Sequence, residues 1–224
     1  MTDDAPHDDV ASDDLDALVR RVDPDRWLSS RFIADPAARA DVIALYAFDH
    51  ELARAPKVAS NPILAEIRLT WWREALDEIF DGRPVRRHPT AQALAAAVRR
   101  HGLPRAPLEA MIDARVRELD GPGDALQWAG DTGGAAAVLA ATILDLKGPA
   151  DAARSAGAAW ALGRREGTGP EVMRQALAAA RTHARRLGVG AFPAVAHAAL
   201  AARPQASDLA RRLRLTWAVA RGRL

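Results

Sequence analysis

The sequence contains no cysteine. A chain without thiols forms no disulfide and builds no iron–sulfur cluster, no thiolate zinc site and no cysteine nucleophile. Aromatic residues make up only 5% of the chain, although hydrophobic residues reach 49%. Alanine dominates that apolar fraction. Because alanine is the best helix former, while strands prefer β-branched and aromatic residues, the composition favours helices.

A long apolar run is also missing. The longest nearly apolar stretch, Ala135–Leu144, has ten residues, whereas a membrane-spanning helix needs about 20. The N-terminal segment is acidic and lacks the charged-then-apolar pattern of a secretory signal. We therefore expect a cytoplasmic protein, and peripheral contact with the inner face of the membrane remains open.

Lysine and arginine are absent from the first 16 positions, which hold seven aspartates. High charge with few apolar residues is typical of disorder, so we expect an acidic disordered tail over residues 1–20 and one folded domain over residues 21–224. Residues 17–224 carry a net charge of +9. A basic body suits an anionic membrane surface, although solvated arginine faces explain it as well. Too few aromatic residues lie among the arginines to indicate nucleic-acid binding, so we expect no nucleic-acid partner.

Proline and glycine divide the chain into helix-length segments. Asp35-Pro36 and Asn61-Pro62 each place a capping residue before a proline at the first helical position. They predict helices that end near Arg54 and Phe80. Further helices are predicted over residues 90–101, 103–119, 124–147, 150–162, 170–187, 191–202 and 207–220. Since no segment alternates with period 2, we predict an all-α, single-domain fold of about eight to nine helices.

Local catalytic signatures are absent as well. The chain has no glycine-rich phosphate loop and no HExxH motif. None of its six histidines has another at i+3 or i+4 with which to share a metal ion. Thr132-Gly133-Gly134 is too short for a phosphate cradle, and we interpret it as a site of close helix packing or a kink.

Three stretches are the most distinctive parts of the sequence: Asp25–Phe32 (DRWLSSRF), Ala44–Ala55 (ALYAFDHELARA) and Glu66–Val85 (EIRLTWWREALDEIFDGRPV). They resemble the squalene/phytoene synthase family, most closely a divergent branch that includes a mitochondrial complex I assembly factor. The resemblance extends through His88–Leu119 and becomes poor after about Leu162. It implies an isoprenoid-synthase-like helical fold.

In active members of that family, two aspartate-rich helical motifs hold Mg²⁺, which neutralises the diphosphate leaving group as two prenyl diphosphates are joined. The positions that match the first motif here read Ala53-Arg54-Ala55-Pro56-Lys57, without a carboxylate. The second motif falls near Gly157–Glu166, where Glu166 is the only acid. Asp49 and Glu51 do not replace the motif, because residues two apart on a helix point about 200° apart.

The best row of carboxylates is Glu74, Asp77 and Glu78, spaced i, i+3 and i+4, and Asp81 continues it. Glu74, Asp77 and Glu78 are weak candidates for a Mg²⁺ site. They do not match a metal motif of the family, and we interpret them as a solvated face that pairs with Arg73 and Arg83.

We therefore predict a family member that has lost prenyltransferase activity, needs no cofactor and acts as a binding or assembly protein. The resemblance implies respiratory complex I subunits as partners. The alternative is an active Mg²⁺-dependent prenyltransferase that condenses prenyl diphosphates in isoprenoid biosynthesis. A prenyl or other apolar ligand and an anionic membrane remain open as further contacts. The candidate ligand-binding residues are Tyr46, Asp49, Arg54, Arg68, Trp71 and Arg73.

These candidates also have structural interpretations. Tyr46 suits a cavity lining or the core equally well. Asp49 lies on an apolar helix face, and a buried acid needs a partner; we expect a structural ion pair with an arginine such as Arg54, Arg68 or Arg73. For Trp71, packing is favoured over stacking on a ligand.

Overall fold

In the computed structural model, helices begin at both predicted caps, Asp35-Pro36 and Asn61-Pro62. The structure describes residues 7–58, 61–121, 123–203 and 205–224. The Asn61 side chain accepts a hydrogen bond from the Leu64 amide (3.0 Å) at the start of α4 (Pro62–Phe80). Asp23, which was not predicted as a cap, caps α2 (Pro24–Ser30) in the same way through the Arg26 amide (3.1 Å). The side-chain oxygen of the capping residue, just before the first helical residue, accepts a hydrogen bond from an amide that has no partner within the helix. This explains why these residues start helices.

The described residues form helices and no strands, which confirms the all-α prediction. The α-helices of the described residues are numbered α1 to α11, slightly more than the eight to nine helices predicted. In chain order the elements are α1 (His7–Val22), α2 (Pro24–Ser30), α3 (Pro36–Val58), α4 (Pro62–Phe80), α5 (Pro89–His101), α6 (Arg105–Leu119), α7 (Ala125–Ala129), the π-helix η1 (Gly130–Gly134), α8 (Ala135–Leu144), η2 (Ala150–Ala153), α9 (Arg154–Leu162), α10 (Pro170–Ala184), η3 (Phe192–Ala194), η4 (Ala196–Leu200) and α11 (Asp208–Arg221).

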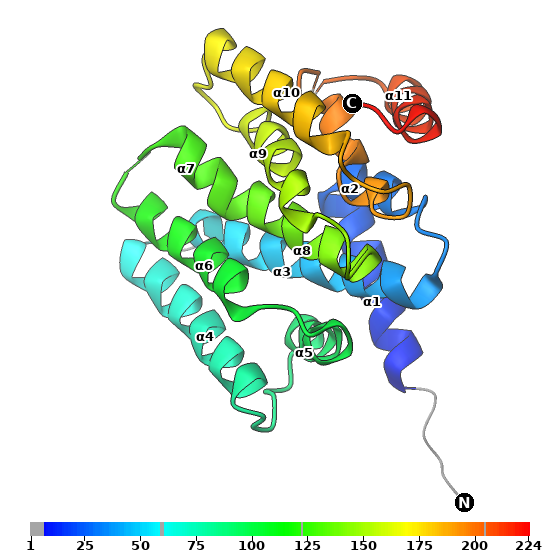
Figure 1. The fold of residues 1–224 in the computed structure, drawn as a ribbon. Helices are drawn as coiled ribbons and strands as arrows, with labels where there is room; N and C mark the ends of the chain where they lie inside the picture. The colour runs from blue at the N-terminus through cyan, green and yellow to red at the C-terminus, as the bar shows by residue number, and fades with distance from the viewer. Residues whose placement is uncertain (1–6, 59–60, 122, 204) are drawn as a thin grey trace, which may run out of the picture.

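Helix α3 is the centre of the packing. It contacts α1, α2, α4, α5, α6 and α8, and Figure 1 shows it running through the middle of the bundle. Val42, Leu45, Phe48 and Leu52 are fully buried along its length, at the three- and four-residue spacing that keeps one helix face apolar. Helices α4 and α5 lie at one end of the molecule in Figure 1, and α10 and α11 lie at the other.

The predicted disordered tail over residues 1–20 is wrong from His7 onward, where α1 begins; residues 1–6 lie outside the described part of the chain. Leu15 and Val19, four residues apart, are buried in the core, and α1 packs against α3 and α5. The folded domain therefore starts before residue 21. Average composition hid this pattern, because many aspartates surround a few well-spaced apolar residues.

Three other predicted helices differ from the structure. Residues 191–202 form the short 3₁₀ segments η3 and η4 instead of one α-helix. The predicted helix over residues 124–147 is interrupted by η1, and its regular part ends at Leu144. Helix α3 in turn continues past Pro56 to Val58. A proline this close to the end of a helix removes only one backbone hydrogen bond, so it does not stop the helix at Arg54.

Candidate functional site

A cluster of buried charges lies beside the central helix. Asp49 on α3 is only 7% exposed. Its Oδ2 accepts a hydrogen bond from Nη1 of Arg26 (2.5 Å), and Nη2 of Arg115 lies 3.6 Å from its Oδ1. Burial raises the pKa of Asp49, but the two guanidinium groups outweigh this effect and hold it below its ordinary value. Asp49 is therefore charged and paired inside the protein.

Aromatic side chains surround the same arginine. The Arg26 guanidinium lies 3.9 Å from the centre of the Trp160 ring and 5.0 Å from that of Tyr46. His197 meets both rings edge-on, at 5.3 and 6.2 Å. All four side chains are buried. They fill the space between α2, α3, α9 and η4, and cations favour such contacts with aromatic faces.

His197 is uncharged in this environment. Burial, together with the charges of Arg26 and Arg164, holds the pKa of His197 well below its ordinary value. Neither of its ring nitrogens has a hydrogen-bond partner in the described structure, and the Tyr46 hydroxyl is in the same position. The two side chains contribute ring packing.

A second buried acid, Asp25 on α2, is the meeting point of three elements. It is 3% exposed and pairs with Arg164 at the end of α9. Nε of Arg211, on α11, lies 3.5 Å from its other carboxylate oxygen. Arg164 also stacks on the Trp160 ring at 4.2 Å. The C-terminal helix is thus tied to the body by a buried charge.

The helix that matches the family's second metal motif is packed against its neighbour without a gap. A Cβ atom added at Gly157 would lie 2.0 Å from the carbonyl oxygen of Gly133, and one added at Gly133 would lie 2.5 Å from that of Gly157. The two backbones touch only because neither residue has a side chain. The interpretation of Thr132-Gly133-Gly134 as a close-packing site or a kink is confirmed, since these residues also form the π-helix η1.

The side chains at the two motif positions do not suit Mg²⁺, which prefers several oxygen ligands. Among the described residues, no group of three or more acidic or histidine side chains could hold a metal ion. The weak candidates on α4 are engaged elsewhere. Glu78 and Glu74 bind Arg86 (2.7 and 3.2 Å), and Asp77 binds Arg105 (2.5 Å). Hydrogen bonds from Arg86 lower the pKa of Glu78 to about 2.

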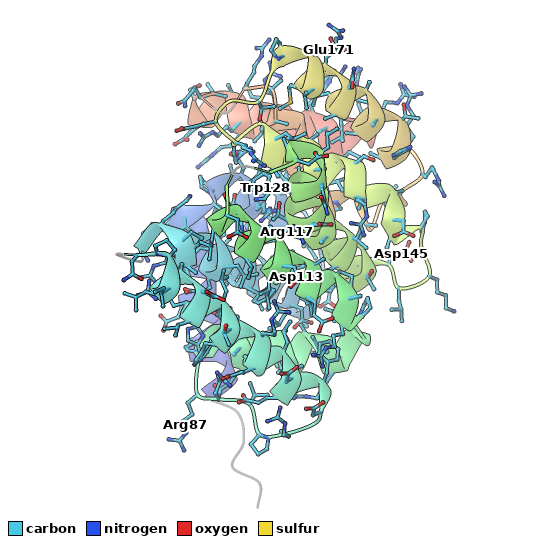
Figure 2. The ribbon with its side chains drawn as sticks, turned by 90° about the vertical axis from the view of Figure 1, so that its left-hand side faces the viewer. Arg87, Asp113, Arg117, Trp128, Asp145 and Glu171 are labelled. Atoms are coloured by element: carbon cyan, nitrogen blue, oxygen red, sulfur yellow. The ribbon has the colours of Figure 1, made fainter. Side chains whose placement is uncertain are left out.

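One of the two expected partners was wrong. Arg83 does pair with Asp81, which continues the row (3.1 Å). Arg73 instead pairs with Asp113 on α6 (2.7 Å), which is labelled in Figure 2. The row Glu74, Asp77 and Glu78 is a charged helix face, as interpreted, but different arginines neutralise it.

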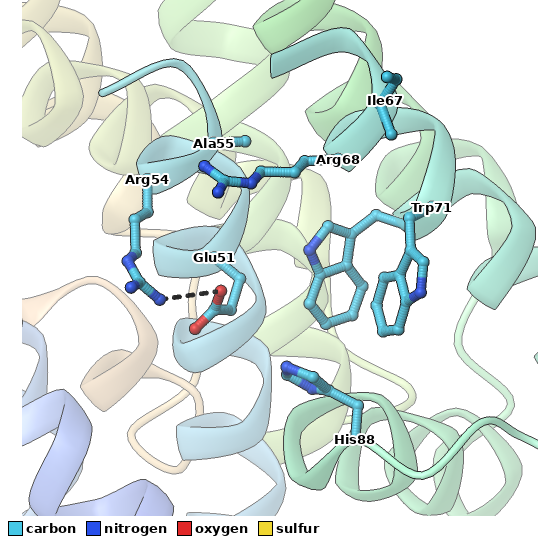
Figure 3. Close-up of a pocket in the computed structure, with 8 residues that line it drawn as sticks. Glu51, Arg54, Ala55, Ile67, Arg68, Trp71 and His88 are labelled. Atoms are coloured by element: carbon cyan, nitrogen blue, oxygen red, sulfur yellow. Dashed lines mark ion pairs between the residues drawn. The ribbon is translucent and has the colours of Figure 1, made fainter. Parts of the chain in front are cut away.

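An open pocket lies on the other side of α3, between that helix and α4. It has a volume of about 310 Å³ and is lined by Glu51, Arg54, Ala55, Ile67, Arg68, Trp71, Trp72 and His88. In Figure 3, Arg54 and Arg68 extend into the space from the two helices, Trp71 lies on its right-hand side and His88 lies below it. The rings of Trp71 and His88 meet at 5.3 Å.

Charge in this pocket is incompletely balanced. Glu51 lies 3.8 Å from Arg54, a long ion pair, and in the described structure Arg68 makes no ion pair or hydrogen bond. Trp72 is buried against Phe48 (5.2 Å between ring centres), whereas Trp71 is partly exposed. The pocket thus combines an aromatic wall with an excess of positive charge, and it suits a group that is apolar at one end and anionic at the other.

The structure divides the predicted ligand-binding residues among three places. Arg54, Arg68 and Trp71 meet in the pocket. Tyr46 and Asp49 are buried in the interior cluster. Arg73 lies apart and pairs with Asp113. The ion pair expected for Asp49 exists, but the proposed partners Arg54, Arg68 and Arg73 were wrong.

Sequence reasoning missed Asp25, Arg26, Arg115 and His197 as interior residues. One signal was available for the first two. The DRWLSSRF stretch begins just after Asp23-Pro24, the same cap pattern used elsewhere, and its helix buries four polar residues: Asp25, Arg26, Ser29 and Ser30. Nothing local marks Arg115 or His197.

Comparison with known proteins supports the family resemblance seen in the sequence. The profile of the squalene/phytoene synthase family matches residues 19–164. The chain is 35% identical over 104 residues to NADH dehydrogenase (ubiquinone) complex I, assembly factor 6, of Bos taurus, and 33% identical over 104 residues to the Homo sapiens protein of the same name. Each match covers 46% of this chain but only 30% of the relative. The matched segment is therefore less than a third of the length of these relatives.

Solved structures share the fold over nearly the whole chain. A dehydrosqualene synthase in complex with a ligand superposes with a TM-score of 0.72 at 14% identity, covering 96% of both chains. A squalene synthase from Alicyclobacillus acidocaldarius gives a TM-score of 0.59 at 15% identity, covering 97% of both chains. At such low identity the likeness concerns the fold alone.

Proposed function

This chain belongs to the squalene/phytoene synthase family, and we propose that it serves in protein assembly and not in prenyl transfer. The relatives at 33–35% identity are named complex I assembly factors. By extension, the partner would be a subunit or an assembly intermediate of respiratory complex I. No cofactor is part of this proposal.

The charge distribution beside α3 and α9 is the observation that carries the proposal. A prenyl diphosphate bears several negative charges, and catalysis requires divalent ions beside it as the carbocation forms. The matching positions hold Arg54 and Lys57 on α3, and alanine, glycine and tryptophan on α9. The interior next to them is occupied by Arg26, Tyr46 and Trp160. These features oppose the Mg²⁺-dependent alternative.

The pocket between α3 and α4 is the proposed contact site for the partner. Ile63, Leu64 and Ile67 are exposed on α4 beside it, with exposed fractions of 67%, 42% and 58%. Together with Trp71, they offer an apolar surface next to the Arg68 guanidinium, which forms no ion pair with any residue that the structure describes. A partner segment with an apolar side chain close to a carboxylate would fit this combination. A prenyl or other apolar ligand with an anionic end is the second occupant to be tested.

The proposed setting is the cytoplasm, at the inner face of the membrane. None of the described helices has the length and hydropathy that a membrane crossing requires.

A deletion strain tests the assembly role directly. We expect membranes of that strain to lose assembled complex I on native gels and to lose NADH:quinone reductase activity. The wild-type gene should restore both, whereas the double variant Arg68→Glu/Trp71→Ala should not. Arg87→Glu is the matched control, because Arg87 is exposed and, in Figure 2, projects away from the body on the loop before α5. Normal complex I in the deletion strain would overturn the proposal.

A second measurement tests the enzymatic alternative. The purified protein is incubated with a prenyl diphosphate and Mg²⁺, and released diphosphate is measured. We expect no release above a blank without protein. Release that depends on both Mg²⁺ and protein would reinstate the alternative. Calorimetric titration with the same prenyl diphosphate, with and without Mg²⁺, reports whether the pocket still binds such a molecule.

A further inference from the structure

Helix α11 turns an apolar row toward solvent. Leu209, Leu213 and Trp217 are 69%, 62% and 60% exposed. They are spaced four residues apart, which places them along one side of the helix over about 12 Å. Leu215 and Ala218, on the opposite side, are buried against the body. The apolar row is therefore exposed even though α11 is already docked.

Arginines flank this row on both sides. Arg212 and Arg214 precede and follow Leu213, so each lies about 100° around the helix from it. Farther along, the Arg221 guanidinium stacks on the exposed Trp217 ring at 3.8 Å. Asp208 is the only acid of α11. An apolar face bordered by arginines, with a tryptophan on it, is typical of a helix that lies in a membrane interface.

The whole C-terminal part of the chain shares this positive charge. Residues 161–224 hold 12 arginines and three acids, a net charge of +9, whereas residues 17–160 hold 19 basic and 19 acidic residues and have no net charge. The positive charge of the body is therefore concentrated at the end of the molecule formed by α10 and α11 (Figure 1). A negatively charged surface would attract this end more strongly than the rest of the body.

The helix is also preformed. Nε of Arg211 lies 3.5 Å from the buried Asp25, and α11 packs against α2 and η4. Ser207 caps its first turn, and Gly222, at φ 58°, ends it. Binding thus incurs no cost for folding the helix, unlike a disordered basic segment that orders on contact.

From these four observations we infer that α11 docks the protein onto the surface of an anionic lipid bilayer. Leu209, Leu213 and Trp217 enter the boundary between headgroups and acyl chains, while Arg212 and Arg214 contact lipid phosphates. Charge favours a bilayer over a second copy of the chain, since a two-fold contact between two α11 faces would bring their arginines together. The inference does not depend on the assembly role.

Vesicle binding by the 224-residue chain tests the inference that α11 docks onto a bilayer. The probes are phosphatidylcholine vesicles with and without about 30% phosphatidylglycerol. We expect binding to the anionic vesicles only, and weaker binding as salt is raised. Leu213→Glu should reduce the partition coefficient at least about tenfold, and Arg212→Ala/Arg214→Ala should reduce it about 30-fold.

Leu126→Glu is the matched control. It makes the same change on α7 at a residue of similar exposure, 53%, and should bind vesicles as the wild type does. Circular dichroism confirms that each variant is folded. Equal binding to neutral vesicles, or equal losses in Leu213→Glu and Leu126→Glu, would overturn the inference. So would a wild-type dimer in sedimentation that Leu213→Glu dissociates, because the row would then be an interface between copies.

The two proposals fail separately. Normal complex I in the deletion strain leaves the vesicle result untouched. Loss of vesicle binding by Leu213→Glu with full restoration of complex I would establish the docking surface and show that assembly does not require it.

Discussion

The arginines of the interior and those of α11 differ in burial and in what they contact. In the interior, Arg26 is 2% exposed, and it is held by a carboxylate and by aromatic rings. On α11, Arg212 is exposed and Arg214 partly exposed, beside apolar side chains that face solvent. A buried charge must be paired where it stands, so the interior arginines are structural. Surface arginines lose little when they exchange water for a phosphate, so they remain available for binding.

The largest effect is expected from removing the shared acid of the interior. Asp49→Ala leaves Arg26 and Arg115 without their common partner, and breaking a buried pair in this way costs about 3–5 kcal/mol of unfolding free energy. Urea unfolding measures it. The control is Asp113→Ala, which removes an exposed pair with Arg73 and should change stability by less than about 1 kcal/mol. Equal effects at the two positions would erase the distinction between interior and surface charges.

The glycine contact comes next. Gly157→Ala places a Cβ atom 2.0 Å from the Gly133 carbonyl oxygen, which forces α9 away from η1 and should cost about 1–3 kcal/mol. Gly130→Ala is matched, since Gly130 is helical and a Cβ there meets nothing within 4 Å. It should be neutral or stabilising by about 0.5–1 kcal/mol. Opposite signs in thermal unfolding would confirm the close packing; a tolerated Gly157→Ala would contradict it.

Lowering the pH should destabilise the folded protein through its buried histidine, His197. The folded-state pKa of His197 is lowered, so below about pH 6.5 the unfolded chain binds a proton that the folded chain does not. Stability therefore falls as pH falls, by up to about 1.4 kcal/mol per pH unit for this residue.

His197→Gln should flatten that slope. Part of it should remain, because burial also lowers the pKa values of His50 and His88. The measurement is urea unfolding between pH 7.5 and 5, compared with the wild type. An unchanged slope would mean that His197 is not buried as a neutral ring.

The smallest effect is expected on α11. Arg214→Ala should change the unfolding free energy by no more than about 0.5 kcal/mol, as is usual for surface positions. Chemical denaturation in the absence of lipid measures it. A loss of more than about 2 kcal/mol would place Arg214 with the structural arginines and remove the contrast between the two regions.

Part of the site was predictable because it depends on local order. Arg54, Arg68 and Trp71 belong to two helices that follow one another in the chain, and these residues do meet in the pocket. Arg115 and His197 were not predictable, since they reach the cluster from 66 residues beyond Asp49 and 151 residues beyond Tyr46. The prediction for α1 failed for another reason. Net composition outweighed the spacing of Leu15 and Val19, which is what a helix needs to bury one face.

The sequence by itself determined the family, the helical class, most helix starts, the absence of carboxylates at the first metal motif and the presence of only one, Glu166, at the second. Each of these follows from residue identity or from spacing within a few turns. Only the tertiary structure decided that Asp25 joins Arg164 and Arg211, that Gly133 meets Gly157, and that the apolar row of α11 faces outward. Ion pairs and side-chain packing act over a few ångströms in space, and local periodicity does not record which distant segments come that close.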